Sequence, residues 1–246
     1  MLTRNVAPGI HCVTESHVNL YLVEEGDRVL LVDAGLPTSW RPLTAALTEL
    51  GRRPQDIAAL VLTHGHFDHL GIAERLRTEL GVPVYIHEND VPLTRRPRQY
   101  THARPLTGYL FQLAALPIVA GLVARRAWWP KPVRHVERIR EQGVLPVPGS
   151  PRVLFTPGHT LGHCALHFPD RDAVIAGDAV VTLDPYRGTT GPQIVSGAAT
   201  ADEDRALDSL RVIAETGAGT ILVGHGPPWR GGAERMVDLA RRRGPS

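Results

Sequence analysis

Four side chains that commonly bind metal ions lie within six residues of one another: His64, His66, Asp68 and His69. Imidazole nitrogens and carboxylate oxygens suit zinc, iron or manganese. Because side chains alternate along an extended backbone, positions 64, 66 and 68 can point in one direction. The adjacent pair Asp68 and His69 then diverges, so one loop could serve two neighbouring ions.

Three further candidate ligands each stand beside a glycine, at the end of a short apolar run: His159, Asp178 and His225. Glycine adopts backbone conformations that other residues avoid, and it leaves room at a crowded centre. Loops at one edge of a layered sheet are a common location for function. The alternative is a cluster of ordinary core histidines, which would require seven coincidences. A metal site is therefore the preferred interpretation.

The order of these residues resembles the metallo-β-lactamase-fold superfamily of hydrolases, which includes glyoxalase II enzymes and acyl-homoserine lactonases. The similarity begins at the segment Leu-Val-Asp-Ala-Gly, residues 31–35, and ends at His225. It implies an α+β fold, a four-layer αβ/βα sandwich, with the metals in a groove at one edge of the sheets. We expect a single domain over residues 1–246, with a helical, lid-like insertion at about 90–142.

The resemblance also implies a dinuclear centre in which seven side chains share two ions. It places His64, His66 and His159 on the first ion. It places Asp68, His69 and His225 on the second ion, and Asp178 between the two. Each position carries the residue type that the family has. Zinc is the expected metal, with iron or manganese as alternatives.

Other polar residues near the motif are expected to support the ligands. Asp33 ends a predicted strand, where its carboxylate would orient a ligand histidine. His163 follows His159 by four positions and is also expected to lie behind the ligands. The thiol of Cys164 has no neighbouring base in the sequence, so a nucleophilic role is not expected.

The expected reaction is hydrolysis of an ester-type bond, such as a thioester or a lactone. Two divalent ions about 3.5–4 Å apart can hold a bridging hydroxide and polarise the carbonyl that it attacks. The family suggests that Asp68 also steers a proton to the leaving group. Tyr186 lies shortly after Asp178, and its hydroxyl could donate to the developing oxyanion. The alternative for Tyr186 is a packing role.

Three other functions remain open on the same scaffold. A mononuclear-iron persulfide dioxygenase would need only one metal, whereas here the second ligand set is complete. A phosphodiesterase would need a surface for nucleic acid that the length and charge do not indicate. A metal-binding scaffold without turnover is the non-enzyme alternative.

Residues 90–142 interrupt the regular pattern with six prolines and an apolar run at 110–123. The run is shorter than the roughly 20 residues that a membrane-spanning helix needs. We interpret the segment as a lid whose aromatic side chains line a pocket for an acyl or aromatic group. Those side chains are Tyr109, Phe111, Trp128 and Trp129. A homodimer contact and an interfacial membrane contact are the alternatives.

Composition and charge bound the remaining possibilities. The formal net charge is +2, too small by itself to indicate a nucleic-acid partner. Arginines cluster at residues 95–98 and 125–126, which we interpret as solvated surface. Two cysteines form no disulfide framework, and the first nine residues lack the apolar core of a signal peptide. We therefore expect a cytoplasmic enzyme with a small-molecule substrate.

Short apolar runs and helical periodicity predict alternating strands and helices. Glycines at the ends of two of the expected helices are natural stops. Strands are expected at residues 19–23, 29–32, 57–62, 82–87, 152–156, 164–168, 173–176 and 220–223, and helices at 39–50, 69–80, 202–216 and 231–241.

Overall fold

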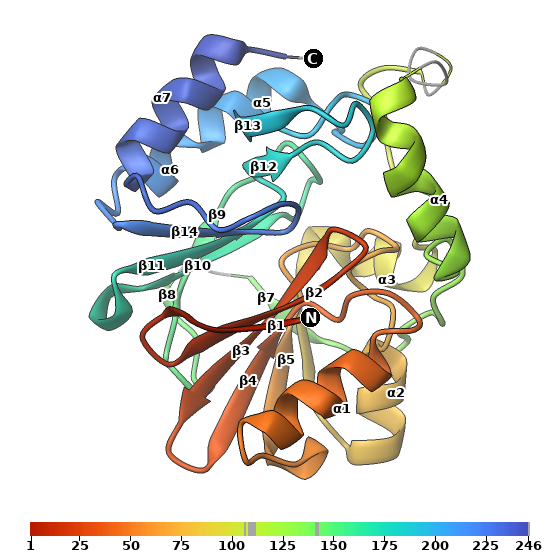
Figure 1. The fold of residues 1–246 in the computed structure, drawn as a ribbon, viewed down its shortest axis with the longest axis vertical. Coiled ribbons are helices and arrows are strands. Elements are labelled where there is room, and N and C mark those ends of the chain that lie inside the picture. Colours follow the sequence, from red (N-terminus) through yellow and green to blue (C-terminus); the bar gives the residue numbers. More distant parts are fainter. Residues whose placement is uncertain (106, 108–111, 141–142, 246) are drawn as a thin grey trace.

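Two β-sheets stacked face to face form the centre of the protein (Figure 1). The computed structural model describes residues 1–105, 107, 112–140 and 143–245. In this part of the chain, the larger sheet has seven strands that neighbour one another in chain order. They are β1 (Leu2–Ala7), β2 (Ile10–Glu15), β3 (Val18–Glu25), β4 (Arg28–Val32), β5 (Ile57–Val61), β6 (Val84–His87) and β7 (Glu137–Ile139).

The smaller sheet has five strands within the described residues, in the order β14-β11-β10-β9-β8. Beside it lies a two-stranded ribbon of β12 and β13. Their bounds are β8 (Gly143–Val144), β9 (Arg152–Phe155), β10 (Cys164–Phe168), β11 (Ala173–Gly177), β12 (Val181–Leu183), β13 (Thr190–Gln193) and β14 (Thr220–Val223).

Helices cover the outer face of each sheet (Figure 1). The larger sheet is covered by α1 (Trp40–Glu49) and α2 (Ala73–Leu80), and the smaller sheet by α5 (Glu203–Ser209), α6 (Arg211–Ala214) and α7 (Ala233–Arg243). The layers therefore run helix, sheet, sheet, helix. The α+β sandwich expected from the sequence is confirmed.

Both faces of the larger sheet are buried, which explains the uninterrupted apolar runs of its strands. In β3, Leu20 and Leu22 pack with the α1 side chains Leu43 and Leu47. The alternate residue Tyr21 faces the smaller sheet instead. A strand with a hydrophobic layer on either side shows no polar alternation, so its sequence reads as one apolar block.

The parallel strand pairs explain why the candidate ligands meet. Strands β4, β5, β6 and β7 pair in parallel, as do β11 and β14. The carboxyl ends of parallel strands lie at one edge of a sheet, which is the usual place for a site in such folds. Asp33 follows β4, the 64–69 motif follows β5, Asp178 follows β11, and His225 follows β14.

The predicted helix at 69–80 begins later, at Ala73, because residues 64–70 form a loop that turns the ligands inward. The predicted helix at 202–216 divides into α5 and α6. Strands β1 and β2 were not predicted from the sequence, since the exposed part of β1 lacks a clear hydrophobic alternation.

The range 90–142 holds two helices, α3 (Val91–Arg95) and α4 (Leu116–Ala124), but it also supplies strand β7. That strand extends the larger sheet by pairing with β6. Tyr109 and Phe111, expected to line a pocket, lie outside the described residues. Among the described residues, none of the helices combines the length and apolar character needed to cross a membrane.

Gly71 fixes the histidine loop against the end of β4. Its amide donates to the carbonyl of Gly35 at 2.7 Å. A Cβ placed on Gly71 would lie 2.0 Å from the carbonyl carbon of Leu36, which is backbone and cannot rotate away. The loop and the strand end therefore approach one another at a distance that only glycine permits.

We expect Gly71→Ala to lower the free energy of unfolding by about 2–3 kcal/mol, because the added methyl overpacks a rigid backbone contact. Urea denaturation measures the effect. The matched control is Gly121→Ala in α4, where the nearest atom is the flexible Ser16 Oγ at 3.1 Å. That control should be neutral or stabilising by up to about 1 kcal/mol. Equal losses in both variants would contradict the steric explanation.

Candidate metal centre

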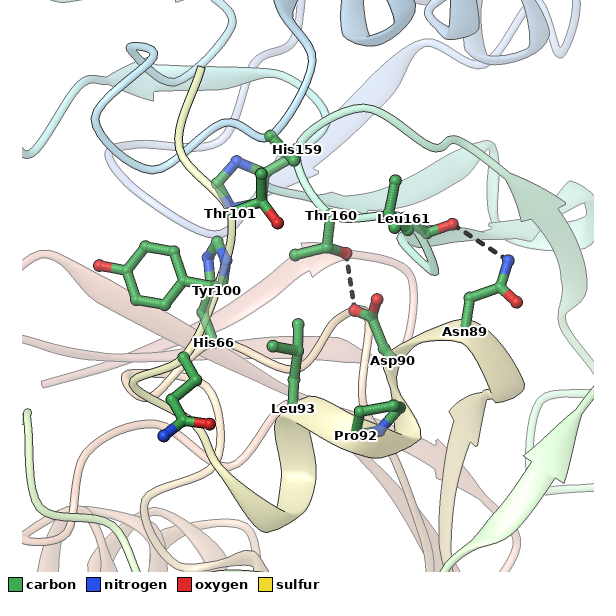
Figure 2. Close-up of a pocket in the computed structure, with 12 residues that line it drawn as sticks. His66, Asn89, Asp90, Pro92, Leu93, Tyr100, Thr101, His159, Thr160 and Leu161 are labelled. Atoms are coloured by element: carbon green, nitrogen blue, oxygen red, sulfur yellow. Dashed lines mark hydrogen bonds between the residues drawn. The ribbon is translucent and has the colours of Figure 1, made fainter. Parts of the chain in front are cut away.

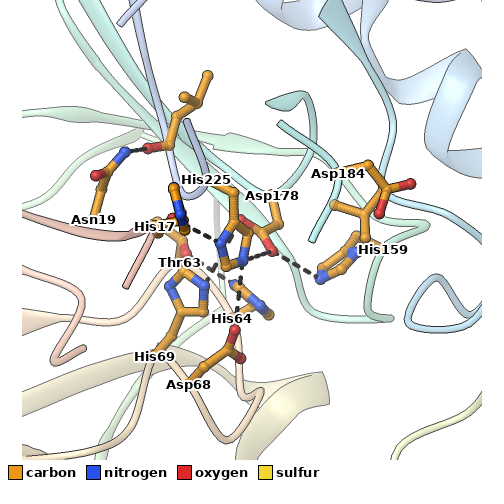
Figure 3. Close-up of polar contacts among 12 residues, drawn as sticks. His17, Asn19, Thr63, His64, Asp68, His69, His159, Asp178, Asp184 and His225 are labelled. Atoms are coloured by element: carbon orange, nitrogen blue, oxygen red, sulfur yellow. Dashed lines mark hydrogen bonds and ion pairs between the residues drawn. The ribbon is translucent and has the colours of Figure 1, made fainter. Parts of the chain in front are cut away.

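The structure brings the seven predicted ligands together in one buried cluster at the shared edge of the two sheets. Figure 3 shows six of them, and His66 is drawn in Figure 2. They form three overlapping groups, and within each group the ligand atoms lie within 4.8 Å of one another. The groups are His64, His66 and His159; His64, His69 and Asp178; and Asp68, His69 and His225. Residues from four separate loops therefore share one small volume.

Buried polar atoms without partners test whether a metal fits this cluster. Among the described residues, the Nε2 atoms of His64, His66, His69 and His159 and the Oδ1 atom of Asp178 are buried and accept or donate no hydrogen bond. A buried polar atom left unpaired costs about 1–3 kcal/mol. Five such atoms in one place are explained by divalent ions bound among them, and nitrogen and carboxylate donors suit zinc, iron or manganese.

Asp33 orients two of the ligand histidines. Its carboxylate contacts Nδ1 of His69 at 3.0 Å and accepts a hydrogen bond from the Thr63 hydroxyl at 2.9 Å. The same hydroxyl contacts Nδ1 of His64 at 3.0 Å. Each ring thus has one nitrogen occupied and its Nε2 free for a ligand. Asp33 has φ +61°, a left-handed conformation that directs the chain sharply at the end of β4.

The loops that carry His159 and His225 are held in the same manner. Thr200 Oγ1 lies 3.3 Å from Nδ1 of His159, and the His17 carbonyl lies 3.1 Å from Nδ1 of His225. Asn19 in β3 donates to the carbonyls of Val223 and Gly226, both at 2.8 Å, so it brackets the His225 loop. A residue of the larger sheet thereby positions a ligand of the smaller sheet (Figure 3).

The ligands divide electrostatically into neutral and cationic histidines. Burial lowers the pKa of His66 to about 4 and the pKa of His64 and His159 well below the ordinary value. For His69, carboxylates led by Asp178 outweigh the effect of burial and raise the pKa to about 9. A bound cation would replace that proton, since a histidine binds a metal only when it is neutral.

His163 lies behind the ligands. Its Nδ1 contacts the Thr156 hydroxyl at 2.7 Å, and its Nε2 accepts a hydrogen bond from the Asp178 amide at 3.1 Å. Both ring nitrogens are thus occupied, so the ring positions Asp178 without binding an ion. Cys164 is buried, and burial raises the pKa of its thiol, which keeps the thiol protonated and argues against a nucleophilic role.

Asp90 joins the two loops that carry the histidines of the first predicted ion. It is fully buried. Its Oδ2 accepts hydrogen bonds from the Gly65 amide at 2.9 Å and the Thr160 hydroxyl at 2.6 Å, and its Oδ1 accepts one from the Gly162 amide at 2.7 Å. Burial raises the pKa of Asp90 to about 6, in spite of these donors. The carboxylate therefore fixes the separation of the two ligand loops.

A cavity of about 190 Å³ opens onto His66 and His159 (Figure 2). Its walls include the apolar side chains of Pro92, Leu93 and Leu161. Most of the residues that line it come from segment 89–101 and from the His159 loop. Trp128 and Trp129, predicted to line a pocket, border a different cavity of about 320 Å³ with Arg95, Arg96 and Arg98.

A pair of tyrosines reaches the cluster. The ring of Tyr100 lies 4.4 Å from the ring of His66, between centroids, and its hydroxyl lies 3.4 Å from that of Tyr186. Burial raises the pKa of both phenols, so both remain hydrogen-bond donors. Tyr100 lines the cavity, whereas Tyr186 reaches it through Tyr100.

Sequence reasoning did not identify Asp90 or Tyr100. Asp90 lies 25 residues from Gly65 and 70 from Thr160, so no local spacing relates it to the motif. Tyr100 lies in an irregular segment, where periodicity gives no orientation for a side chain.

Comparison with known proteins gives a consistent result. The model of the metallo-beta-lactamase superfamily matches residues 13–225. The chain is 31% identical to the probable metallo-hydrolase YflN of Bacillus subtilis, over 96% of this chain and 91% of YflN. Among solved structures, the metallo-beta-lactamase family protein TTHA1429 of Thermus thermophilus is 28% identical with a TM-score of 0.71, over 96% of this chain and 79% of that one. TTHA1623, solved in a di-iron-bound form, is 30% identical with a TM-score of 0.62, over 93% and 94%.

We expect Asp90→Asn to lower the metal affinity of the protein by tenfold or more, because an amide cannot accept hydrogen bonds on both of its ends. Competition between the metal-free protein and a chromogenic chelator measures this affinity. The control is Asn89→Ala, which removes only a 3.4 Å hydrogen bond to the Leu161 carbonyl. Unchanged affinity in Asp90→Asn would show that the loops hold their separation without this carboxylate.

Proposed function

Because the chain belongs to the metallo-beta-lactamase superfamily and is an enzyme of the metal-dependent hydrolase class, we propose that it is a dinuclear zinc hydrolase that cleaves an ester-type bond, such as a thioester or a lactone, in a small molecule. One observation supports the proposal: two sets of three candidate ligands lie side by side, and most of their buried ligand atoms have no hydrogen-bond partner. Asp178 lies between the two sets, since its Oδ2 is 3.5 Å from His159 Nε2 and 3.1 Å from His225 Nε2.

Seven side chains would hold the two ions: His64, His66, Asp68, His69, His159, Asp178 and His225. The ions would supply an acidified water molecule as the nucleophile and a Lewis acid for the carbonyl oxygen. The protein supplies fixed ligand orientation through Asp33, Thr63 and Thr200, together with a water-poor interior. A catalytic cluster held in this way needs little reorganisation during the reaction.

Asp68 is the group best placed to move a proton. Its Oδ2 lies 3.4 Å from His225 Nε2. Against the effect of burial, His69 and His225 lower the pKa of Asp68, so the carboxylate is ionised at neutral pH. An ionised carboxylate beside the reacting atoms can accept a proton from water and return it to the leaving group.

The cavity beside His66 favours an uncharged acyl group. A volume of about 190 Å³ corresponds to roughly six water molecules, so it fits a short chain or a small ring. Among the described residues, no lysine or arginine lines it, and Asp90 is saturated by its three donors. Apart from the ions themselves, the described walls offer no cationic side chain for the other phosphates of a nucleic acid strand, whereas they suit an acyl group.

The identity of the metal separates the main proposal from an oxidative one. A persulfide dioxygenase would use a single iron, whereas this chain places Asp68, His69 and His225 together as a second ligand set. The similarity to TTHA1623, solved with two irons, makes iron the alternative metal. The metal content of the purified protein therefore has to be measured together with its turnover.

We expect the purified protein to contain about two zinc ions per chain and to hydrolyse thioesters or lactones, and His66→Ala to lose metal and at least about 10³-fold in kcat/KM. Elemental analysis and a panel of thioesters, lactones and phosphodiesters provide both readouts. His135→Ala, at an exposed histidine, is the matched control. One iron per chain with oxygen uptake on a persulfide, and no hydrolysis, would overturn the proposal.

Replacing the two tyrosines should separate a direct role from an indirect one. We expect Tyr100→Phe to lower kcat by about 10–100-fold with little change in KM, because its hydroxyl would donate to charge that forms only in the transition state. Tyr186→Phe should have a smaller effect, since its hydroxyl reaches the cavity through Tyr100. Steady-state kinetics on the best ester test this, with Tyr85→Phe as the control. Full kcat in both variants would assign the pair to packing.

A further inference from the structure

The basic residues of the chain are concentrated in one segment. Residues 91–140 contain nine Arg and one Lys but a single acidic residue, Glu137, out of 27 basic and 25 acidic residues in the whole chain. The rest of the chain thus carries 17 basic and 24 acidic residues. The net charge of +2 conceals a strongly positive segment on a negative remainder. Such asymmetry indicates a surface for an anionic partner.

Helix α4, within this segment, exposes an apolar face. All nine of its residues are uncharged, and only Ile118 and Leu122 are buried against the protein. The exposed fractions are 78% for Leu113, just before the helix, 54% for Leu116 and 51% for Val123. Large apolar side chains at helical spacing on the outside of a protein mark a contact surface. In Figure 1, α4 lies at the right-hand margin, away from the two outer helical layers.

Arginine and tryptophan border the end of this face. Arg126 is exposed directly after α4, and Trp129 is 58% exposed. Trp129 lines the 320 Å³ cavity together with Arg95, Arg96 and Arg98. In the part of the chain that the structure describes, Arg95, Arg98 and Arg126 form no ion pair. Aliphatic, aromatic and cationic side chains in this order match the boundary between the acyl region and the headgroups of a bilayer.

We propose that the exposed face of α4, with Trp129 and the neighbouring arginines, docks the protein on the surface of a membrane that contains anionic phospholipids. Leu113, Leu116 and Val123 would enter the outermost acyl region, and Trp129 would lie at headgroup depth. The arginines would pair with lipid phosphates, each contributing through the negative surface potential. The helix lies on the membrane without crossing it.

A lipid surface explains these features better than a second copy of the chain or a nucleic acid. A twofold contact would bring two copies of the same patch together, so the arginines of both copies would lie close without an acidic counterpart on the patch. A nucleic acid would pair with the arginines but would leave the aliphatic side chains exposed. A bilayer with anionic headgroups outside and acyl chains beneath complements both the arginines and the exposed aliphatic side chains.

The docking face is linked to the metal cluster by direct packing. Ile118 and Leu122 of α4 pack in one cluster with Phe67, which lies between the ligands His66 and Asp68 in the sequence. The ring of Phe67 also stacks on Trp128, with centroids 5.2 Å apart. The docked face and the site are thus parts of one packed unit, which places the site near the membrane surface.

Co-sedimentation with vesicles tests the proposal on the chain of residues 1–246. Vesicles of 30% phosphatidylglycerol in phosphatidylcholine should bind the protein at low salt, and pure phosphatidylcholine vesicles should bind it at least tenfold more weakly. Raising the salt to 0.5 M should reverse most of the binding. The double variant Leu116→Asp and Val123→Asp should reduce binding by at least tenfold, and Arg126→Glu by about fivefold or more.

The matched control is Leu239→Asp, at a 36% exposed leucine on α7, far from α4 in Figure 1. It should bind vesicles as the unmodified protein does. Circular dichroism and metal content establish that each variant is folded. Absence of binding to the anionic vesicles, or binding unaffected by the α4 variants, would overturn the proposal. A dimer that forms without lipid and is lost in Leu116→Asp would also overturn it and assign the face to a second copy.

Discussion

Most of the structure serves one requirement, which is to hold seven ionisable side chains together in a buried site. Burial, helped by repulsion from neighbouring histidines, lowers the pKa of His64, His66 and His159 and keeps these rings neutral. The cationic rings of His225 and His69 stabilise the carboxylate of Asp178. Unpaired nitrogens in such a cluster are unfavourable until a cation binds them. Folding therefore gathers these ligands at a cost in free energy, and a bound cation would offset that cost.

Three buried polar residues position the ligand histidines, and each of the three connects segments that are distant in the sequence. Asp33 fixes His69 from the end of β4, and Asn19 holds the His225 loop across the interface of the two sheets. Asp90 ties the loop that carries His66 to the loop that carries His159. None of them depends on a flexible surface contact. The geometry of the cluster is consequently a property of the sandwich as a whole, and a change in either sheet is transmitted to the ligands.

The sequence was informative where local pattern and chemistry coincide. The apolar runs gave the central strands because both faces of the larger sheet are buried, and the spacing of His64, His66 and Asp68 pointed to a shared loop. The sequence was less informative where partners are remote: nothing near Asp90 relates it to Gly65. The position of Tyr100 depends on an irregular segment whose course is set by tertiary packing. The aromatic residues predicted to line a pocket beside the site include Trp128 and Trp129, which border another cavity instead.

The segment around α4 shows why overall composition can mislead. A chain with net charge +2 gives no reason to expect an anionic partner, yet its charges are segregated. The ligand loops cannot tolerate added positive charge, since cations there would compete with the metal ions for Asp68 and Asp178. A separate, outward-facing segment is therefore the place where arginines can accumulate without weakening the cluster. Phe67 connects the two regions through its contacts with α4 and Trp128. The positive surface and the metal site are thus joined by apolar packing.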